Sequence, residues 1–123
     1  MKALTVVVSH GDASAAQSIA DSLRAHFRRV SLAPGRELRQ TIAVNRAQVA
    51  IVDLEAIPLD SVRELCGEFP DTAVICVHRV PDDEMWTAAV NAGAVDCCHS
   101  SDIRSMLLAL RATPARRVFF AAA

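Results

Sequence analysis

The sequence predicts an α/β domain in which five parallel strands alternate with five helices, with the strands in the order 2-1-3-4-5. Several apolar runs rich in β-branched residues show no polar alternation, as expected of strands covered on both faces. Each run is followed by a segment whose apolar residues recur at helical spacing. This alternation implies parallel pairing through right-handed crossovers, and five strands in about 110 residues fit this order.

The first strand and helix are predicted from residues 3–8 and the polar loop that follows them. Residues 3–8 form an apolar run that ends at Ser9-His10-Gly11-Asp12. Asp12 or Ser14 is placed to cap the helix after this loop, because short polar side chains can accept the free backbone N–H groups of a first turn. The apolar stripe of this helix consists of Ala16, Ile19, Ala20, Leu23 and Phe27.

The second and third strands flank a weaker helix. A short strand over residues 29–33 ends at Pro34-Gly35, and the run 49–52 ends directly in Asp53. Between them, residues 37–47 are predicted as a helix. Its inward-facing residues are expected to be Leu38, Ile42 and either Val44 or Asn45.

The remaining elements continue the alternation. A helix capped by Asp60 or Ser61 ends at Pro70, and residues 73–77 form the fourth strand. The apolar face of this helix consists of Val62, Leu65, Cys66 and Phe69. The next helix opens at Pro81-Asp82-Asp83, carries Met85, Trp86, Ala89 and Val90, and is closed by Gly93. After a strand over residues 94–99, Ser100 or Ser101 caps a last helix with Ile103, Met106, Leu107 and Leu110 on one face.

Composition restricts the classes of function. The 123 residues are 52% hydrophobic and 22% charged, with a net charge of −1, which is typical of one globular domain. There is no basic tract, so neither a nucleic acid nor an anionic membrane is expected as a partner. No apolar run approaches the roughly 18 residues that span a bilayer. We therefore expect no membrane insertion and a cytoplasmic location.

The four cysteines do not predict a metal site. Cys66, Cys76, Cys97 and Cys98 include no CxxC pair. His78 and His99 end adjacent predicted strands, and with Cys76 and Cys98 they leave a transition-metal site open as an alternative. Because Cys97 and Cys98 point to opposite faces of a strand, at most some of these groups converge. We expect no metal, and cysteines that are mostly small core residues.

Function in such a sheet is expected at the carboxyl ends of the strands, where Asp53 is the sharpest feature. The (βα)5 pattern, Asp53 at the end of the third strand and Ala92-Gly93-Ala94 before the fifth resemble a response-regulator receiver domain. The resemblance covers residues 2 to 112. It implies a flavodoxin-like, CheY-like fold of the kind used in two-component phosphorelay signal transduction.

The resemblance also implies a set of functional positions, most of which are changed here. In receivers an acidic pair binds Mg²⁺ beside the phosphoacceptor Asp, and a Ser or Thr, a Lys and an aromatic residue complete the pocket. Asp53 matches the phosphoacceptor. The acidic pair falls on Ser9 and His10, the Ser or Thr on His78, the Lys on Ser100 and the aromatic residue on Cys97.

The changed positions indicate a pseudo-receiver that needs no cofactor. Asp53 with a serine hydroxyl is a poor Mg²⁺ site, and Asp12, the possible replacement, is better placed as a helix cap. We expect Asp53 to act as a loop-capping residue rather than as a phosphoacceptor. The variant Asp53→Asn is expected to be neutral or slightly stabilising, because an unpaired buried carboxylate is costly. The alternatives are a divergent phospho-accepting response regulator that uses Asp53 with Mg²⁺, and a small enzyme on this fold, although no nucleophile–base pair is evident.

Two further features predict a partner. The side chains of Met85, Trp86 and Leu108 supply more apolar surface than one inward-facing stripe needs. The face formed by the fourth helix, fifth strand and fifth helix is therefore predicted to bind a protein partner or a second copy of the chain. Residues 118–123 resemble the opening strand of a ParA/MinD-type ATPase. Residues 1–113 would then be the receiver-like domain and 114–123 a linker and the start of the ATPase domain of the parent chain. That arrangement resembles the CpaE/TadZ proteins of Tad/Flp pilus assembly, in which this domain would target or dimerise rather than catalyse.

Overall fold

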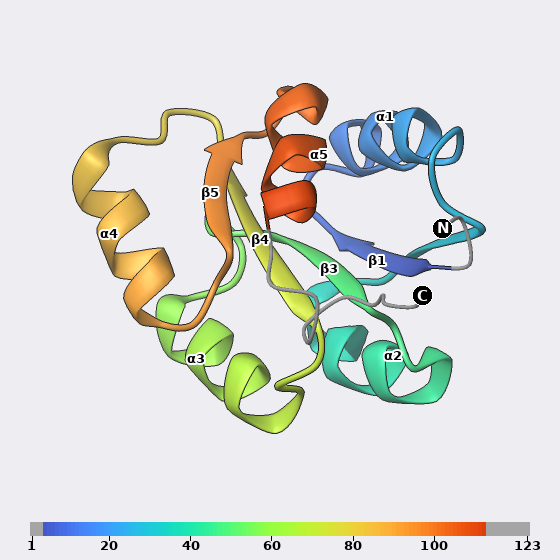
Figure 1. Ribbon diagram of the computed structural model, residues 1–123, viewed down its shortest axis with the longest axis horizontal. Helices are drawn as coiled ribbons and strands as arrows, with labels where there is room; N and C mark the ends of the chain where they lie inside the picture. The colour runs from blue at the N-terminus through green and yellow to red at the C-terminus, as the bar shows by residue number, and fades with distance from the viewer. Residues whose placement is uncertain (1–3, 113–123) are drawn as a thin grey trace.

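The sheet has the predicted topology. The computed structural model describes residues 4–112, in which five parallel strands run in the order β2-β1-β3-β4-β5 (Figure 1). The elements are β1 (Thr5–Ser9), α1 (Ala13–Leu23), β2 (Arg29–Leu32), a 3-10 turn (Gly35–Glu37), α2 (Leu38–Asn45), β3 (Val49–Asp53), α3 (Leu59–Glu68), β4 (Ala73–His78), α4 (Asp83–Asn91), β5 (Asp96–His99) and α5 (Ile103–Ala112). The predicted flavodoxin-like fold is therefore confirmed.

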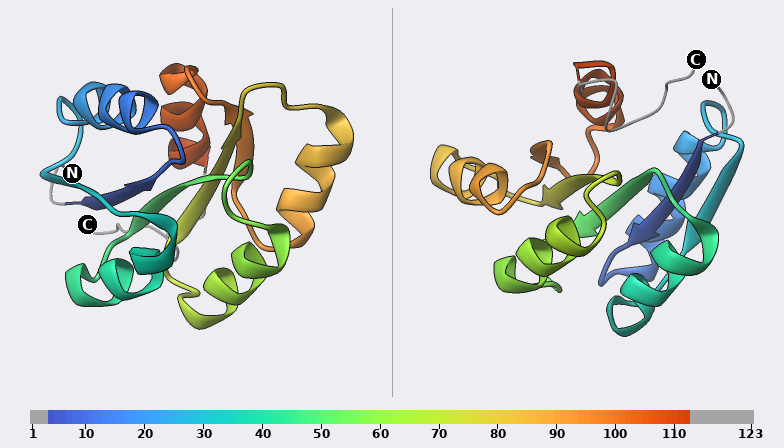
Figure 2. Two further views of the ribbon diagram at one scale, coloured as in Figure 1. Left: turned by 180° about the vertical axis from the view of Figure 1, so that it is seen from behind. Right: turned by 60° about the horizontal axis from the view of Figure 1, so that its bottom comes forward.

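Helices cover both faces of the sheet, which explains the unbroken apolar strands. α1 and α5 lie on one face, and α2, α3 and α4 lie on the other (Figures 1 and 2). Successive side chains of a strand point to opposite faces, so each strand contributes to both layers: Val7 packs under α2, whereas Val6 and Val8 pack under α1. Every residue of β3 is buried, as expected of a central strand.

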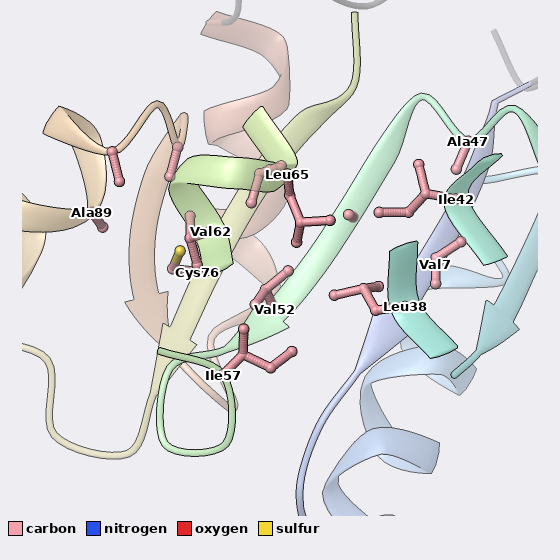
Figure 3. Packing of buried hydrophobic residues seen from close by; sticks show 14 of the residues in the cluster. Val7, Leu38, Ile42, Ala47, Val52, Ile57, Val62, Leu65, Cys76 and Ala89 are labelled. Atoms are coloured by element: carbon pink, nitrogen blue, oxygen red, sulfur yellow. The ribbon is translucent and has the colours of Figure 1, made fainter. Parts of the chain in front are cut away.

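The layer on the side of α2, α3 and α4 is the larger, and it contains apolar residues that the sequence predicts to face inward. Leu38 and Ile42 of α2 point toward the sheet, as do Val62 and Leu65 of α3 (Figure 3). Ile57, in the loop after β3, belongs to the same layer (Figure 3), and its N–H donates to the carbonyl of Asp53 at 2.9 Å. This packing fixes the loops that form the carboxyl edge of the sheet.

Helix capping was predicted correctly for α1 and wrongly for α3 and α5. The carboxylate of Asp12 accepts the N–H of Ser14 at 2.8 Å and of Ala15 at 3.3 Å. α3 begins one residue after Pro58, with no side-chain cap; proline suits this position because its φ is already fixed. At α5 the cap is Asp102, which accepts the N–H of Ser105 at 3.0 Å.

Two further details differ from the predictions. α1 ends at Leu23, so Phe27 packs against the core from the turn beyond the helix. α2 ends at Asn45, where Arg46 takes a left-handed conformation with φ 51°, and Val44 is 73% exposed. Of the two inward candidates, Asn45 is the less exposed and donates to the carbonyl of Thr41. Within residues 4–112, no helix is both long and apolar enough to cross a membrane.

Candidate functional site

Asp53 lies at the carboxyl edge of the sheet, among the residues that the resemblance assigns to the receiver pocket. It is the last residue of the central strand β3, and it pairs in register with Val77 of β4. Its neighbour Val52 pairs with Ser9, the last residue of β1. Parallel strands end at a common edge, so the loops after β1, β3, β4 and β5 converge there. Asp53 therefore lies where the resemblance to receivers places the phosphoacceptor.

Both carboxylate oxygens of Asp53 are occupied by backbone donors. Oδ2 accepts the N–H of Gly11 at 2.9 Å, and Oδ1 accepts the N–H of Glu55 at 2.8 Å. Asp53 is 2% exposed, so these bonds replace most of its hydration. The prediction that this carboxylate is unpaired is therefore wrong, because the loops after β1 and β3 fold back onto it.

His10 fills the space next to Asp53. Its side chain is 6% exposed, and its Nδ1 lies 3.4 Å from Oδ2 of Asp53. The same Nδ1 accepts the backbone N–H of Asp12 at 3.0 Å. A ring nitrogen that accepts a hydrogen bond carries no proton, so the neutral ring is protonated at Nε2, which lies 3.5 Å from Oγ of Ser100. An imidazole thus stands where the resemblance places a carboxylate.

The other predicted pocket residues lie in different surroundings, and of these Ser100 contacts His10. Ser9 and Ser100 are buried at the ends of β1 and β5. His78 is partly exposed, and its Nδ1 accepts the N–H of Val80 in its own loop at 2.9 Å. Cys97 lies in the core between the sheet and the α2–α4 layer, where burial raises the pKa of its thiol. Asp12 caps α1, as predicted.

A salt bridge at the rim was not predicted. Glu55 Oε1 accepts from Nε of Arg79 at 2.8 Å, and Oε2 accepts the backbone N–H of Arg79 at 3.0 Å. These bonds hold the pKa of Glu55 below its usual range and connect the β3–α3 loop to the β4–α4 loop. The available signal was an acid and a base shortly after the ends of two adjacent strands. Such a pattern is common on protein surfaces and is not specific.

The residues of the pocket do not fit Mg²⁺. This cation requires near-octahedral oxygen ligands, but both oxygens of Asp53 accept backbone N–H groups and the carboxylate of Asp12 accepts the first turn of α1. His10 offers nitrogen, which suits transition metals better than Mg²⁺. Across residues 4–112, no group of three or more His, Cys, Asp and Glu side chains is arranged to hold a metal ion.

The predicted interface residues differ in exposure. Trp86 of α4 is 46% exposed, and its indole N–H donates to Oδ1 of Asp96 on β5 at 2.8 Å. Leu108 of α5 is 51% exposed. Met85 is half-buried and packs against the core, so it contributes less apolar surface than expected.

The comparisons identify the fold but not a sequence family. No protein-family model matches the chain, and no curated protein matches it. Among solved structures, the signal receiver domain of NarL from Mycobacterium tuberculosis has a TM-score of 0.75 at 14% identity, over 92% of this chain and 100% of that one. A Burkholderia pseudomallei response regulator, solved with a phosphorylated aspartic acid, has a TM-score of 0.76 at 19% identity, over 92% and 68%.

An orphan response regulator of H. pylori has the same receiver fold, with a TM-score of 0.76 at 14% identity, over 95% of this chain and 98% of that one. The predicted receiver-like fold is therefore confirmed. At this identity the likeness concerns the fold alone. The resemblance to CpaE/TadZ proteins stays a prediction, and residues 113–123, on which it partly depends, lie outside the described residues.

Proposed function

We propose that this chain is a receiver-like domain that acts as a protein-interaction module without phosphorylation of Asp53, and that it has no enzymatic activity of its own. The observation that supports this most is the state of Asp53, whose two oxygens accept backbone N–H groups while His10 stands 3.4 Å away. Hydrogen bonds to both oxygens stabilise the carboxylate as it stands and lower its nucleophilicity toward a phosphoryl donor.

The charges around Asp53 also disfavour phosphotransfer. Transfer to a carboxylate brings negative charges together, and it needs cations to neutralise the phosphoryl oxygens. Here the position of the receiver Lys holds Ser100, and Arg79 is already paired with Glu55. The competing proposal, a divergent phospho-accepting response regulator, is supported by the place of Asp53 at the end of β3. It requires Mg²⁺ to displace the existing contacts.

The proposed interaction surface lies on α4, β5 and α5. The hydrogen bond to Asp96 holds the indole ring of Trp86 in place while nearly half of the residue stays exposed. A pre-positioned aromatic ring loses little entropy on binding, and Trp is the residue type most typical of interface hot spots. Leu108 adds exposed apolar area on α5. We propose a second copy of this chain as the first partner, with another protein as the alternative.

Analytical ultracentrifugation of single variants tests this surface. Trp86→Ala and Leu108→Glu should shift a concentration-dependent dimer toward monomer. Val44→Glu is the matched control, because Val44 is 73% exposed on α2, outside the proposed surface. If wild type and all three variants sediment alike, as dimers or as monomers, the proposed self-association through this surface is wrong.

We further propose that the domain localises a larger protein of the Tad/Flp pilus machinery, with an ATPase domain in the same parent chain. The support is the resemblance to CpaE/TadZ proteins, including residues 118–123. Reading the parent gene tests it: a glycine-rich nucleotide-binding loop should follow Ala123 closely. In cells, a fluorescent fusion of the parent protein should lose its localisation when residues 1–113 are deleted. An unchanged pattern would contradict the localising role.

A further inference from the structure

The ring of His10 faces two partners that cannot both be satisfied by one protonation state. Its Nδ1 accepts the backbone N–H of Asp12 at 3.0 Å and lies 3.4 Å from Oδ2 of Asp53. An unprotonated Nδ1 can accept from Asp12 but meets Asp53 as a second acceptor. A protonated Nδ1 can donate to Asp53 but can no longer accept from Asp12.

The neutral arrangement is held together by consecutive backbone donors. The N–H of Gly11 goes to Asp53 at 2.9 Å, and the N–H of the next residue, Asp12, goes to His10. These two N–H groups offset the repulsion between the facing acceptors. Nε2 carries the ring proton in this state and lies within reach of the Ser100 hydroxyl.

We propose that His10 makes the β1–α1 loop a proton-operated switch. On protonation, Nδ1–H donates to Oδ2 of Asp53, forming a buried ion pair, and the N–H of Asp12 loses its acceptor. Nε2–H stays beside Ser100, so the added proton changes only the contacts of Nδ1 with Asp12 and Asp53. Because Asp12 is also the cap of α1, the reoriented Gly11–Asp12 peptide carries the change to the start of this helix.

The groups that face His10 set the balance of the switch. Asp53 approaches from β3 and favours the charged ring, and the carboxylate of Asp12 lies in the same loop as the ring. Arg79 on the β4–α4 loop opposes a second cation, but Glu55 pairs with it. Ser100, after β5, contributes an uncharged hydroxyl. One buried carboxylate therefore directly faces the imidazole.

The inference goes beyond the proposed interaction role and does not depend on it. In receivers a divalent cation balances the negative charge of the pocket, whereas here a protonated His10 would balance the charge of the Asp53 carboxylate. The pocket would then respond to pH while remaining closed to phosphoryl transfer. A failure of the dimer experiment leaves this inference standing, and a failure of this one leaves the dimer proposal standing.

NMR titration of the ¹⁵N-labelled domain tests the switch, from about pH 8 to about pH 5, where histidines usually titrate and ordinary carboxyl groups do not. At the upper end, His10 should be the Nε2–H tautomer. The amide resonance of Asp12 should then shift with the same midpoint as the His10 ring nitrogens.

Two variants make the readout specific. His10→Gln should abolish the shift of the Asp12 amide over this range, whereas His26→Gln, away from the pocket on the turn after α1, should leave it unchanged. Three results would overturn the proposal: an Nδ1–H tautomer at the upper pH, an Asp12 amide that stays constant while His10 titrates, or a shift that persists in His10→Gln.

Discussion

Replacing Asp53 with asparagine isolates what its charge and second oxygen contribute. Asp53 accepts two backbone N–H groups, at 2.9 and 2.8 Å, and is 2% exposed. Asparagine has one acceptor oxygen, so one N–H loses its partner and faces the side-chain NH₂ instead. A hydrogen bond to a charged group contributes about 1.5–3 kcal/mol, and relief from burying a carboxylate offsets part of this loss.

We expect Asp53→Asn to lower the free energy of unfolding by about 1–3 kcal/mol. At about 4 °C per kcal/mol for a domain of this size, Tm falls by roughly 4–12 °C. Asp71→Asn makes the same chemical change at an exposed site and should stay within about 0.5 kcal/mol of wild type. If thermal melts show Asp53→Asn equal to or more stable than wild type, desolvation outweighs the two bonds and the reasoning is wrong.

Three other perturbations test the packing and the caps. Gly93 has φ +113°, and a Cβ there would lie 2.7 Å from Cβ of Cys66. Gly93→Ala should therefore lower the free energy of unfolding, measured in urea, by about 1–3 kcal/mol. Gly67→Ala, in an open helical position, should instead stabilise by about 0.5–1 kcal/mol; equal effects would contradict the assigned environments. Burial raises the pKa of three core thiols, that of Cys98 to about 12, so native-state alkylation at mildly alkaline pH should spare them until the domain unfolds. They are Cys76, Cys97 and Cys98. Hydrogen bonds from Ser105 lower the pKa of Asp102. The stabilisation they give is therefore present above the ordinary carboxyl pKa and is lost as pH falls through the lower pKa of the folded state. In thermal melts at a series of pH values, Ser105→Ala should reduce the loss of stability on the acid side.

The fold was predictable because its main signals are local. Short apolar runs rich in β-branched residues, such as Val49–Val52, indicate strands covered on both faces, and the helical stripes on α1 and α3 follow from spacing. Errors arose where neighbouring groups compete. Asp102 caps α5 in place of Ser101, whose own N–H and hydroxyl contact Nδ1 of His99. No local pattern shows which of several polar residues reaches the helix end.

The site was predictable in position but not in bonding. The end of β3 places Asp53 at the carboxyl edge, and that much follows from topology. Its partners, the N–H groups of Gly11 and Glu55, come from loop conformations that leave no mark on side-chain identity. The same holds for His10, which the sequence shows as a missing carboxylate and the structure shows as a buried ring against Asp53.

Intact-mass measurement after incubation with acetyl phosphate and Mg²⁺ tests most directly whether this domain works without phosphorylation. A receiver with a complete acidic pair and Lys, treated in parallel, serves as the positive control. The mass of this domain should remain unchanged under conditions that fully label the control. A stoichiometric gain of one phosphoryl group, absent from an Asp53→Asn variant shown to be folded by circular dichroism, would contradict the proposal and establish Asp53 as a phosphoacceptor.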